Sequence, residues 1–282
     1  MEINDEEISI DRALLHRKGA RKVSEVPEEV KVLLQQGRLE TVNLTEWLAV
    51  DHLNLLKNVL DEFGLQKQRD EMLSRLVQIE DKVTKIIPAI ADSWMNLQEQ
   101  MPKTEQFDIV NSLSKHRSDS VRCWAAYMVG LDQLDLEQKL DRIKAFAADE
   151  HFGVREISWM AVRDSVASEL RQSIRLLSSW VHDKNMYIRR FAIEVIRPQG
   201  VWAKHIAELK ENPDIARPLL DAVKSDPVKY VQDSVANWLN DASKTNPDWV
   251  IQLCREWQSS SVTKETERIV KRAQRTLAKK NT

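Results

Sequence analysis

The sequence has few residues that interrupt helices and few that cross-link chains. It holds six Gly and eight Pro among 282 residues, and with 30% charged and 42% hydrophobic residues this composition favours an all-helical protein over a sheet protein. Its two cysteines, Cys123 and Cys254, supply neither a disulfide framework nor a four-thiolate metal site. No run reaches the roughly 18 apolar residues of a membrane span, and the acidic start lacks the apolar core of a secretion signal. We therefore expect a cytoplasmic protein with no membrane contact.

The motifs of several common enzyme classes are also missing. The six histidines form no HExxH and no other short metal-binding spacing. The chain has no GxxxxGK[ST], no GxGxxG and no GxSxG. These absences argue against a zinc hydrolase, a P-loop NTPase, a dinucleotide enzyme and an α/β-hydrolase. We expect no metal and no nucleotide or other cofactor.

Charge is distributed unevenly along the chain. Residues 1–110 carry 14 Lys and Arg against 21 Asp and Glu, a net charge of −7. Residues 111–282 carry 28 against 23, a net charge of +5. This asymmetry is compatible with nucleic-acid binding by the C-terminal part, although it is too small to indicate a basic tail.

The C-terminal two-thirds of the sequence repeats a helical pattern. Five segments share a β-branched residue, usually followed by a polar or basic one, and then small and apolar positions at helical spacing. The spacings between these β-branched anchors are 33, 34, 43 and 38 residues, and the anchors are Val121, Val154, Ile188, Val231 and Ile269. Such periods favour helix pairs stacked as a HEAT-like α-solenoid, with a generic helical bundle as the alternative.

The pattern divides the chain near residue 110. Residues 1–110 contain helical segments that do not match the repeat, and we interpret them as an N-terminal helical subdomain that closes one end of the stack. Residues 1–26 within it are polar, and we expect them to be loosely ordered. Residues 111–282 form the repeat region, continuous with that subdomain.

The stretch "YIRRFAIEVIRPQGVW", from Tyr187 to Trp202, predicts an amphipathic helix that ends near Pro198. Its second face carries Arg190, Glu194 and Arg197 in one line. One interpretation is a solvated surface on which these charges pair with one another, worth a few tenths of a kcal/mol. The other is that the line is directed at a ligand.

A later helix, expected from Pro227 to Ser243, offers a second carboxylate. In the repeat alignment it stands beside the first, so Glu194 and Asp241 could lie on adjacent helices, bordered by arginines and by Trp202. Carboxylates beside cations and an indole suit cleavage of an N-glycosidic bond, because a carboxylate stabilises the oxocarbenium-like sugar and orients water. Arginines supply phosphate contacts, and Trp can hold a cationic base by stacking and cation–π contact.

Two long motifs follow one another in these helices. The pattern RR-x(3)-E-x(2)-RP-x(3)-W is met by Arg189, Arg190, Glu194, Arg197, Pro198 and Trp202. The pattern YVR-x-SVANxLND is met by Tyr230, Val231, Ser234, Val235, Ala236, Asn237, Leu239, Asn240 and Asp241. With them, roughly residues 115–280 resemble the DNA alkylation-repair glycosylases of the HEAT-like-repeat superfamily, the AlkC branch more than the AlkD branch.

The resemblance implies an all-α fold, a HEAT-like α-solenoid of stacked antiparallel helix pairs with a concave basic groove. It implies a monomer that grips duplex DNA with alkylated bases and excises cationic methylated purines. The catalytic carboxylates would be Glu194 and Asp241. The residues in contact with the lesion would be Trp202, His151, Asn237 and Trp238. The residues in contact with the DNA backbone would be Arg155, Arg189, Arg190 and Arg197.

The sequence departs from the family pattern in several places. The family's "EFAIR" segment, whose Glu is an active-site carboxylate, corresponds here to "HFGVR", so that His151 takes its position. Gln199 and Trp238 are further changes. A neutral His cannot supply the charge stabilisation of a carboxylate, and a protonated one would oppose a cationic lesion. Three functions remain open: a DNA N-glycosylase, a non-catalytic binder of DNA structure, and a HEAT-type protein scaffold.

Overall fold

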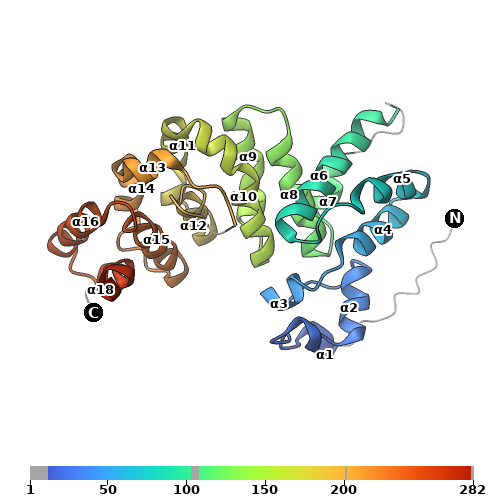
Figure 1. Cartoon of the computed structure of the whole chain (residues 1–282), viewed down its shortest axis with the longest axis horizontal. Coiled ribbons are helices and arrows are strands. Elements are labelled where there is room, and N and C mark those ends of the chain that lie inside the picture. The colour runs from blue at the N-terminus through green and yellow to red at the C-terminus, as the bar shows by residue number, and fades with distance from the viewer. Residues whose placement is uncertain (1–11, 103–107, 201, 281–282) are drawn as a thin grey trace. The chain divides into compact units, whose positions relative to one another are not determined.

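A computed structural model describes residues 12–102, 108–200 and 202–280, and within these ranges the chain forms helices and no β-strand (Figure 1). The predicted all-α fold class is therefore confirmed. The chain divides into two compact units, residues 1–125 and 126–282. The division falls within α8 (Asp119–Leu131), beyond the residue 110 at which the sequence pattern changes. Residues 1–11, part of the segment expected to be loosely ordered, lie outside the described residues.

The first unit consists of short helices around a core rich in tryptophan. Its elements are α1 (Arg12–Leu15), η1 (Val23–Glu25), α2 (Glu28–Gln35), α3 (Leu44–Trp47), α4 (His52–Glu62), α5 (Gln66–Leu76), α6 (Val83–Gln100), α7 (Ile109–Ser114) and the first part of α8. Asn43, Asp51 and Asp108 begin three of these helices, and each side chain accepts a backbone N–H of the first turn. Trp47, Trp94 and Trp124 lie at the centre of the unit with essentially no exposed surface.

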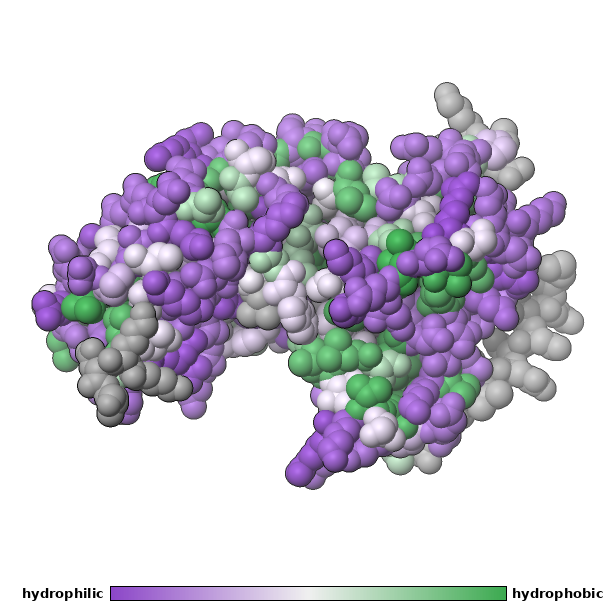
Figure 2. Space-filling view, in the orientation of Figure 1, coloured by the Kyte–Doolittle hydropathy of each residue, from purple (hydrophilic) through white to green (hydrophobic). Residues whose placement is uncertain are grey.

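Polar groups also enter this first core. Arg17 donates from Nε to Oε1 of the buried Glu46 over 3.0 Å, which fastens the segment after α1 to α3. His52 is buried in α4, and its Nδ1 accepts the indole N–H of Trp124 over 3.2 Å. Figure 2 shows hydrophobic side chains at the surface of this unit, where Leu15, Leu44 and Leu48 are exposed.

The second unit is a row of helix pairs. Its elements after α8 are α9 (Leu136–Ala147), α10 (Phe152–Ser168), α11 (Leu170–Leu177), η2 (Trp180–His182), α12 (Met186–Glu194), α13 (Ala207–Glu211), η3 (Pro213–Ala216), α14 (Arg217–Ala222), α15 (Lys229–Ala242), α16 (Pro247–Ser260), α17 (Lys264–Ala273) and α18 (Arg275–Lys280). α10 packs against α9 and α12, α12 packs against α15, and α15 packs against α17 (Figure 1). Four of the helices that carry the repeat pattern, α10, α12, α15 and α17, are therefore spatial neighbours in chain order, as a solenoid requires.

Four of the repeat anchors predicted from the sequence lie near the starts of these helices, and the fifth, Ile269, lies in the middle of α17. All five are buried, each with at most 2% of its surface exposed, and they belong to α8, α10, α12, α15 and α17. Within the second unit, Gly130 of α8 lies so close to α10 that an added Cβ would stand 2.2 Å from the carbonyl oxygen of Ala161. This close approach explains why glycine occupies an otherwise ordinary helical position.

A polar side chain follows the anchor in four of the repeats and ties the helix to its own entry loop. Nη1 of Arg155 donates to the carbonyl oxygens of Asp149 and Glu150 over 2.6 and 2.7 Å. Nη1 of Arg189 donates to those of Asp183 and Lys184 over 2.9 and 3.1 Å. Arg122 and Gln232 make the corresponding bonds in their repeats. We call this contact the loop brace, and it satisfies carbonyl groups that the loop leaves without a helical partner.

Among the described residues, no helix combines the length and the apolar character needed to cross a membrane.

Candidate functional site

The charged line on α12 is buried. Arg190 and Glu194 have 8% and 3% of their surface exposed, because α10 and α15 pack against α12 on both sides of this line. Arg190 donates to Glu156 of α10 over 2.6 Å, and its guanidinium lies 4.4 Å from the ring centre of Tyr230 of α15. The solvated-surface interpretation of this line is therefore wrong: the charges do pair with one another, but they do so inside the protein.

Arg197 joins the two predicted catalytic carboxylates. Its Nη1 lies 3.1 Å from Oε2 of Glu194, and its Nη2 and Nε lie 2.6 and 3.0 Å from Oδ2 of Asp241. The remaining oxygens have partners too, since Ser234 donates to Oε1 of Glu194 over 2.7 Å and Lys244 donates to Oδ1 of Asp241 over 2.9 Å. The expected placement of Glu194 and Asp241 on adjacent helices is confirmed. We call these five side chains the carboxylate cluster.

The cluster keeps Glu194 ionised. Burial alone raises the pKa of a carboxyl group, but the charges of Arg190 and Arg197 and the hydrogen bonds from Ser234 and Arg197 outweigh it and hold the pKa of Glu194 below its ordinary value. At neutral pH this side chain is therefore a fixed negative charge in a site of low water content, where a charge acts more strongly than in water.

The loop after α12 presents Trp202. Arg163 of α10 is buried and donates to the carbonyl oxygens of Val195 and Lys204 over 2.7 and 3.1 Å, so that it ties together the two ends of this loop. Burial lowers the pKa of Arg163 to about 10, with the charge of Arg197 as a further cause, and the side chain stays charged at neutral pH. Trp202 itself has 53% of its surface exposed and a backbone φ of 59°, a left-handed conformation that costs a residue with a Cβ of the order of 1 kcal/mol.

Two other residues predicted to contact the lesion have structural partners. His151 caps α10, and its Nδ1 accepts the backbone N–H of Gly153 over 3.1 Å, which leaves the imidazole proton on Nε2. Asn237 is half-buried on α15 and accepts a hydrogen bond from Arg275 over 3.0 Å. Both belong to the second unit, as does the carboxylate cluster.

Three residues predicted to contact DNA are engaged in contacts within the protein. Trp238 has no exposed surface, and its indole N–H donates to the carbonyl oxygen of Ile196 over 3.0 Å, so it packs α15 against the end of α12 and cannot reach a nucleotide. Arg155 and Arg189 form loop braces instead of facing solvent. Arg189 also makes two hydrogen bonds to the buried Asp226 over 2.6 and 3.1 Å, which leaves its guanidinium little capacity for a phosphate.

Several residues of the site were not singled out from the sequence. Ser234 and Lys244 complete the carboxylate cluster, and Arg163 anchors the loop that carries Trp202. Ser234 lies seven residues before Asp241 on α15, a spacing that places both side chains on one face and could have indicated the contact. Arg163 shares its repeat column with Arg197, but no spacing rule predicts that it donates to the backbone carbonyls of Val195, Arg197 and Lys204.

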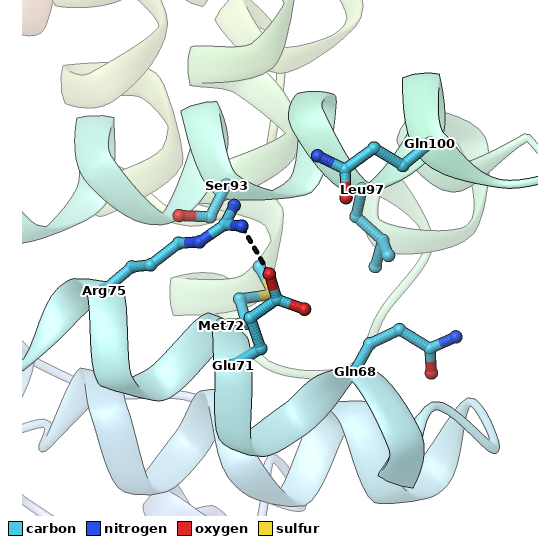
Figure 3. Close-up of a pocket in the computed structure, with 7 residues that line it drawn as sticks. All are labelled: Gln68, Glu71, Met72, Arg75, Ser93, Leu97 and Gln100. Carbon is cyan, nitrogen blue, oxygen red and sulfur yellow. Dashed lines mark hydrogen bonds and ion pairs between the residues drawn. The ribbon is translucent and has the colours of Figure 1, made fainter.

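A pocket in the first unit lies apart from these residues. It lies between α5 and α6, and Figure 3 shows its lining of Gln68, Glu71, Met72, Arg75, Ser93, Leu97 and Gln100. Its charges already neutralise each other, because Arg75 pairs with Glu71. Among the described residues no group of three or more His, Cys, Asp and Glu is arranged to hold a metal ion.

The contacts of Arg189 with Asp226 and with its entry loop should contribute measurably to the stability of the protein. Arg189→Met is expected to lower the free energy of unfolding by about 2 kcal/mol, because it leaves Asp226 buried without its cation and the entry loop without its brace. Arg171→Met removes the same charge from an exposed pair with Glu208 and should change stability by less than about 0.5 kcal/mol. Urea denaturation of both variants measures the difference, and equal stabilities would contradict the brace.

Comparison with known proteins gives one family. The family model described as "DNA alkylation repair enzyme" matches residues 128–272. The uncharacterized protein YhaZ of Bacillus subtilis (strain 168) is 36% identical over 150 residues, which are 53% of this chain and 41% of that protein. The chain therefore spans about two-fifths of this relative.

Two solved structures share the fold. The Pseudomonas fluorescens alkylpurine DNA glycosylase AlkC, bound to DNA containing an abasic site analog, matches 85% of this chain and 66% of its own with a TM-score of 0.62 and 24% identity. AlkD2 from Streptococcus mutans matches 74% of this chain and 97% of its own with a TM-score of 0.57 and 23% identity. At these identities the likeness supports the fold.

Proposed function

The chain belongs to the DNA alkylation repair enzyme family, and from that premise we propose that it binds duplex DNA containing alkylated bases and hydrolyses the N-glycosidic bond of cationic methylated purines. We propose that it acts in the cytoplasm as a monomer. The carboxylate cluster carries the proposal, because it combines two carboxylates from neighbouring repeats with an exposed tryptophan on the adjoining loop.

The two carboxylates of the cluster and Trp202 each have a use in this reaction. A methylated purine already carries a positive charge, so it leaves with the electron pair of the C1′–N bond without needing a proton from the protein. The sugar then gains oxocarbenium character, which an ionised carboxylate at Glu194 or Asp241 stabilises. Water adds to C1′, and a carboxylate that orients this water accepts its proton. Trp202 has the exposed aromatic face that stacks on a cationic base.

One observation favours a second function, that of a DNA binder without catalysis. His151, which stands in the position of a family carboxylate, uses Nδ1 to cap α10 and brings no negative charge to the site. The site would then have two carboxylates available where the family pattern has three. The same surface could still hold a damaged duplex.

Incubation of the purified protein with methylated duplex DNA tests the proposal directly. The expected result is release of free methylated purines into solution, measured by chromatography, at a rate well above that of spontaneous depurination. DNA binding that weakens steeply with salt, without base release, would support the non-catalytic binder. Absence of salt-dependent DNA binding would contradict both and favour a protein scaffold.

A further inference from the structure

Arg197 occupies the position in the cluster that a cationic ligand would need. Its guanidinium contacts Glu194 on one side and Asp241 on the other, over 3.1 and 2.6 Å. The side chain is 11% exposed, and the two carboxylates are 3% and 6% exposed. The negative charges on which the proposed reaction depends are thus already satisfied by a cation of the protein itself.

The charges around Arg197 leave no excess of negative charge, because the buried Arg163 adds a positive charge to three balanced pairs. Arg190, Arg197 and Lys244 supply three positive charges, and Glu194, Asp241 and Glu156 supply three negative ones, all in direct contact with a partner of opposite sign. With these pairs intact, the carboxylates contribute no net negative charge that attracts a cationic base, and only the aromatic face of Trp202 favours it over a neutral base of the same shape. A preference that comes from the carboxylates therefore requires that one of the three positive side chains leaves its carboxylate.

Arg197 is the side chain whose departure frees the most negative charge. Arg190 is held between Glu156, Tyr230 and Glu194, and Lys244 contacts Asp241 alone among the carboxylates. Arg197 contacts both carboxylates that face the proposed reaction. Without Arg197 the two buried carboxylates would keep only Arg190 and Lys244 as partners and would be left with unpaired oxygens, so they release Arg197 only as another cation takes its place.

We propose that Arg197 is a tethered competitor of the lesion: its guanidinium is displaced from Glu194 and Asp241 by a cationic base, and it sets how strongly the site prefers that base to a neutral one. The inference rests on the proposed function, because it takes DNA with a cationic base as the ligand. On displacement the guanidinium pairs with a phosphate of the same duplex, so that neither charge stays uncompensated. This replaces a permanent backbone contact, the role predicted for Arg197 from the sequence.

The test compares affinities for two duplexes that differ only in the charge of one base. One contains N7-methylguanine on a 2′-fluoroarabino sugar, which resists cleavage, and the other contains the neutral isostere 7-deaza-7-methylguanine. Arg197→Gln is expected to increase the ratio of the two affinities at least about tenfold over the wild type, because it removes the competing cation and leaves both carboxylates. The ratio cancels any loss of general DNA affinity that the substitution also causes.

A matched control removes one positive charge elsewhere. Arg171 lies on the exposed surface of α11, and Arg171→Gln should leave the ratio of the two affinities unchanged. An unchanged or lowered ratio in Arg197→Gln, together with weaker binding of both duplexes, would overturn the inference and restore the backbone role.

Added guanidinium ion keeps the test informative if the cluster rearranges in the variant. In Arg197→Ala, guanidinium chloride at tens of millimolar should return the ratio toward the wild-type value, whereas sodium chloride at equal ionic strength should not. Equal effects of the two salts would contradict the proposal. Neither duplex needs to be cleaved in this test. If the wild type releases no base, the affinity ratio of Arg197→Gln can still exceed that of the wild type. The proposed catalysis would then be contradicted, while the inference about Arg197 would be supported.

Discussion

Glu194→Gln is expected to lower the single-turnover rate of base release by at least about two orders of magnitude. The substitution keeps the shape of the side chain and its hydrogen bond from Ser234, but it removes the charge that stabilises the oxocarbenium-like sugar. Asp241→Asn should have an effect of similar size. Because both carboxylates share Arg197, the double variant should be little slower than either single one. Single-turnover assays with protein in excess over methylated duplex measure all three rates.

Glu156→Gln provides the matched control for this series. Glu156 is a carboxylate of the same surface, but it is 30% exposed and its ion pair is with Arg190. Its rate should stay within about tenfold of the wild type. A rate for Glu194→Gln that is also within tenfold of the wild type would show that Glu194 is structural, provided that both variants unfold at similar urea concentrations.

The second large effect concerns stability and acidity. Complete burial lowers the pKa of His52 from 6.5 to about 4 in the folded protein. Between these two values the unfolded chain binds a proton that the folded chain does not, so the free energy of unfolding falls as the pH falls. We expect this side chain to remove about 3 kcal/mol of stability between pH 6.5 and pH 4, and to have no such effect above pH 6.5.

Urea denaturation across this pH range isolates the effect when the wild type is compared with His52→Gln. The glutamine can still accept the hydrogen bond from the indole of Trp124, but it cannot take up a proton. The stability of the variant should therefore decline less steeply with acid, while His182→Gln, at an exposed position, should follow the wild type. Parallel curves for wild type and His52→Gln would show that His52 does not titrate in this way.

The fold could be predicted because its signal is local. The repeat anchors mark buried positions in five helices, and the helix expected from Pro227 to Ser243 is α15, Lys229–Ala242. The helix expected to end near Pro198 ends earlier, at Glu194. Directly after it, Arg163 donates a hydrogen bond to the carbonyl oxygen of Val195. A partner 32 residues away in the sequence determines that end, and no local pattern contains it.

The sequence was sufficient to predict which charged residues of the site lie together, but not that they are buried. Helical spacing places Arg190 and Glu194 on one face of α12, with Arg197 just beyond its end, and the repeat places Asp241 beside them. Spacing does not reveal that α10 and α15 close over that face and convert a row of surface charges into a buried cluster. Trp238 shows the same limit, since its position in a family motif predicted a ligand contact while its packing against α12 gives it a role in the core.

The loop braces have a consequence for how the second unit folds. Each brace joins residues five or six positions apart, so the entry loop of a repeat can close at little entropic cost before its neighbour is in place. Cooperation between neighbours depends on longer-range contacts such as Arg189 with Asp226. Glu194 and Asp241 belong to successive repeats, and Arg197 holds them only when both are folded. Glu194 and Asp241 are therefore paired only while both of their repeats are folded. The pair is lost whenever the less stable of the two repeats unfolds.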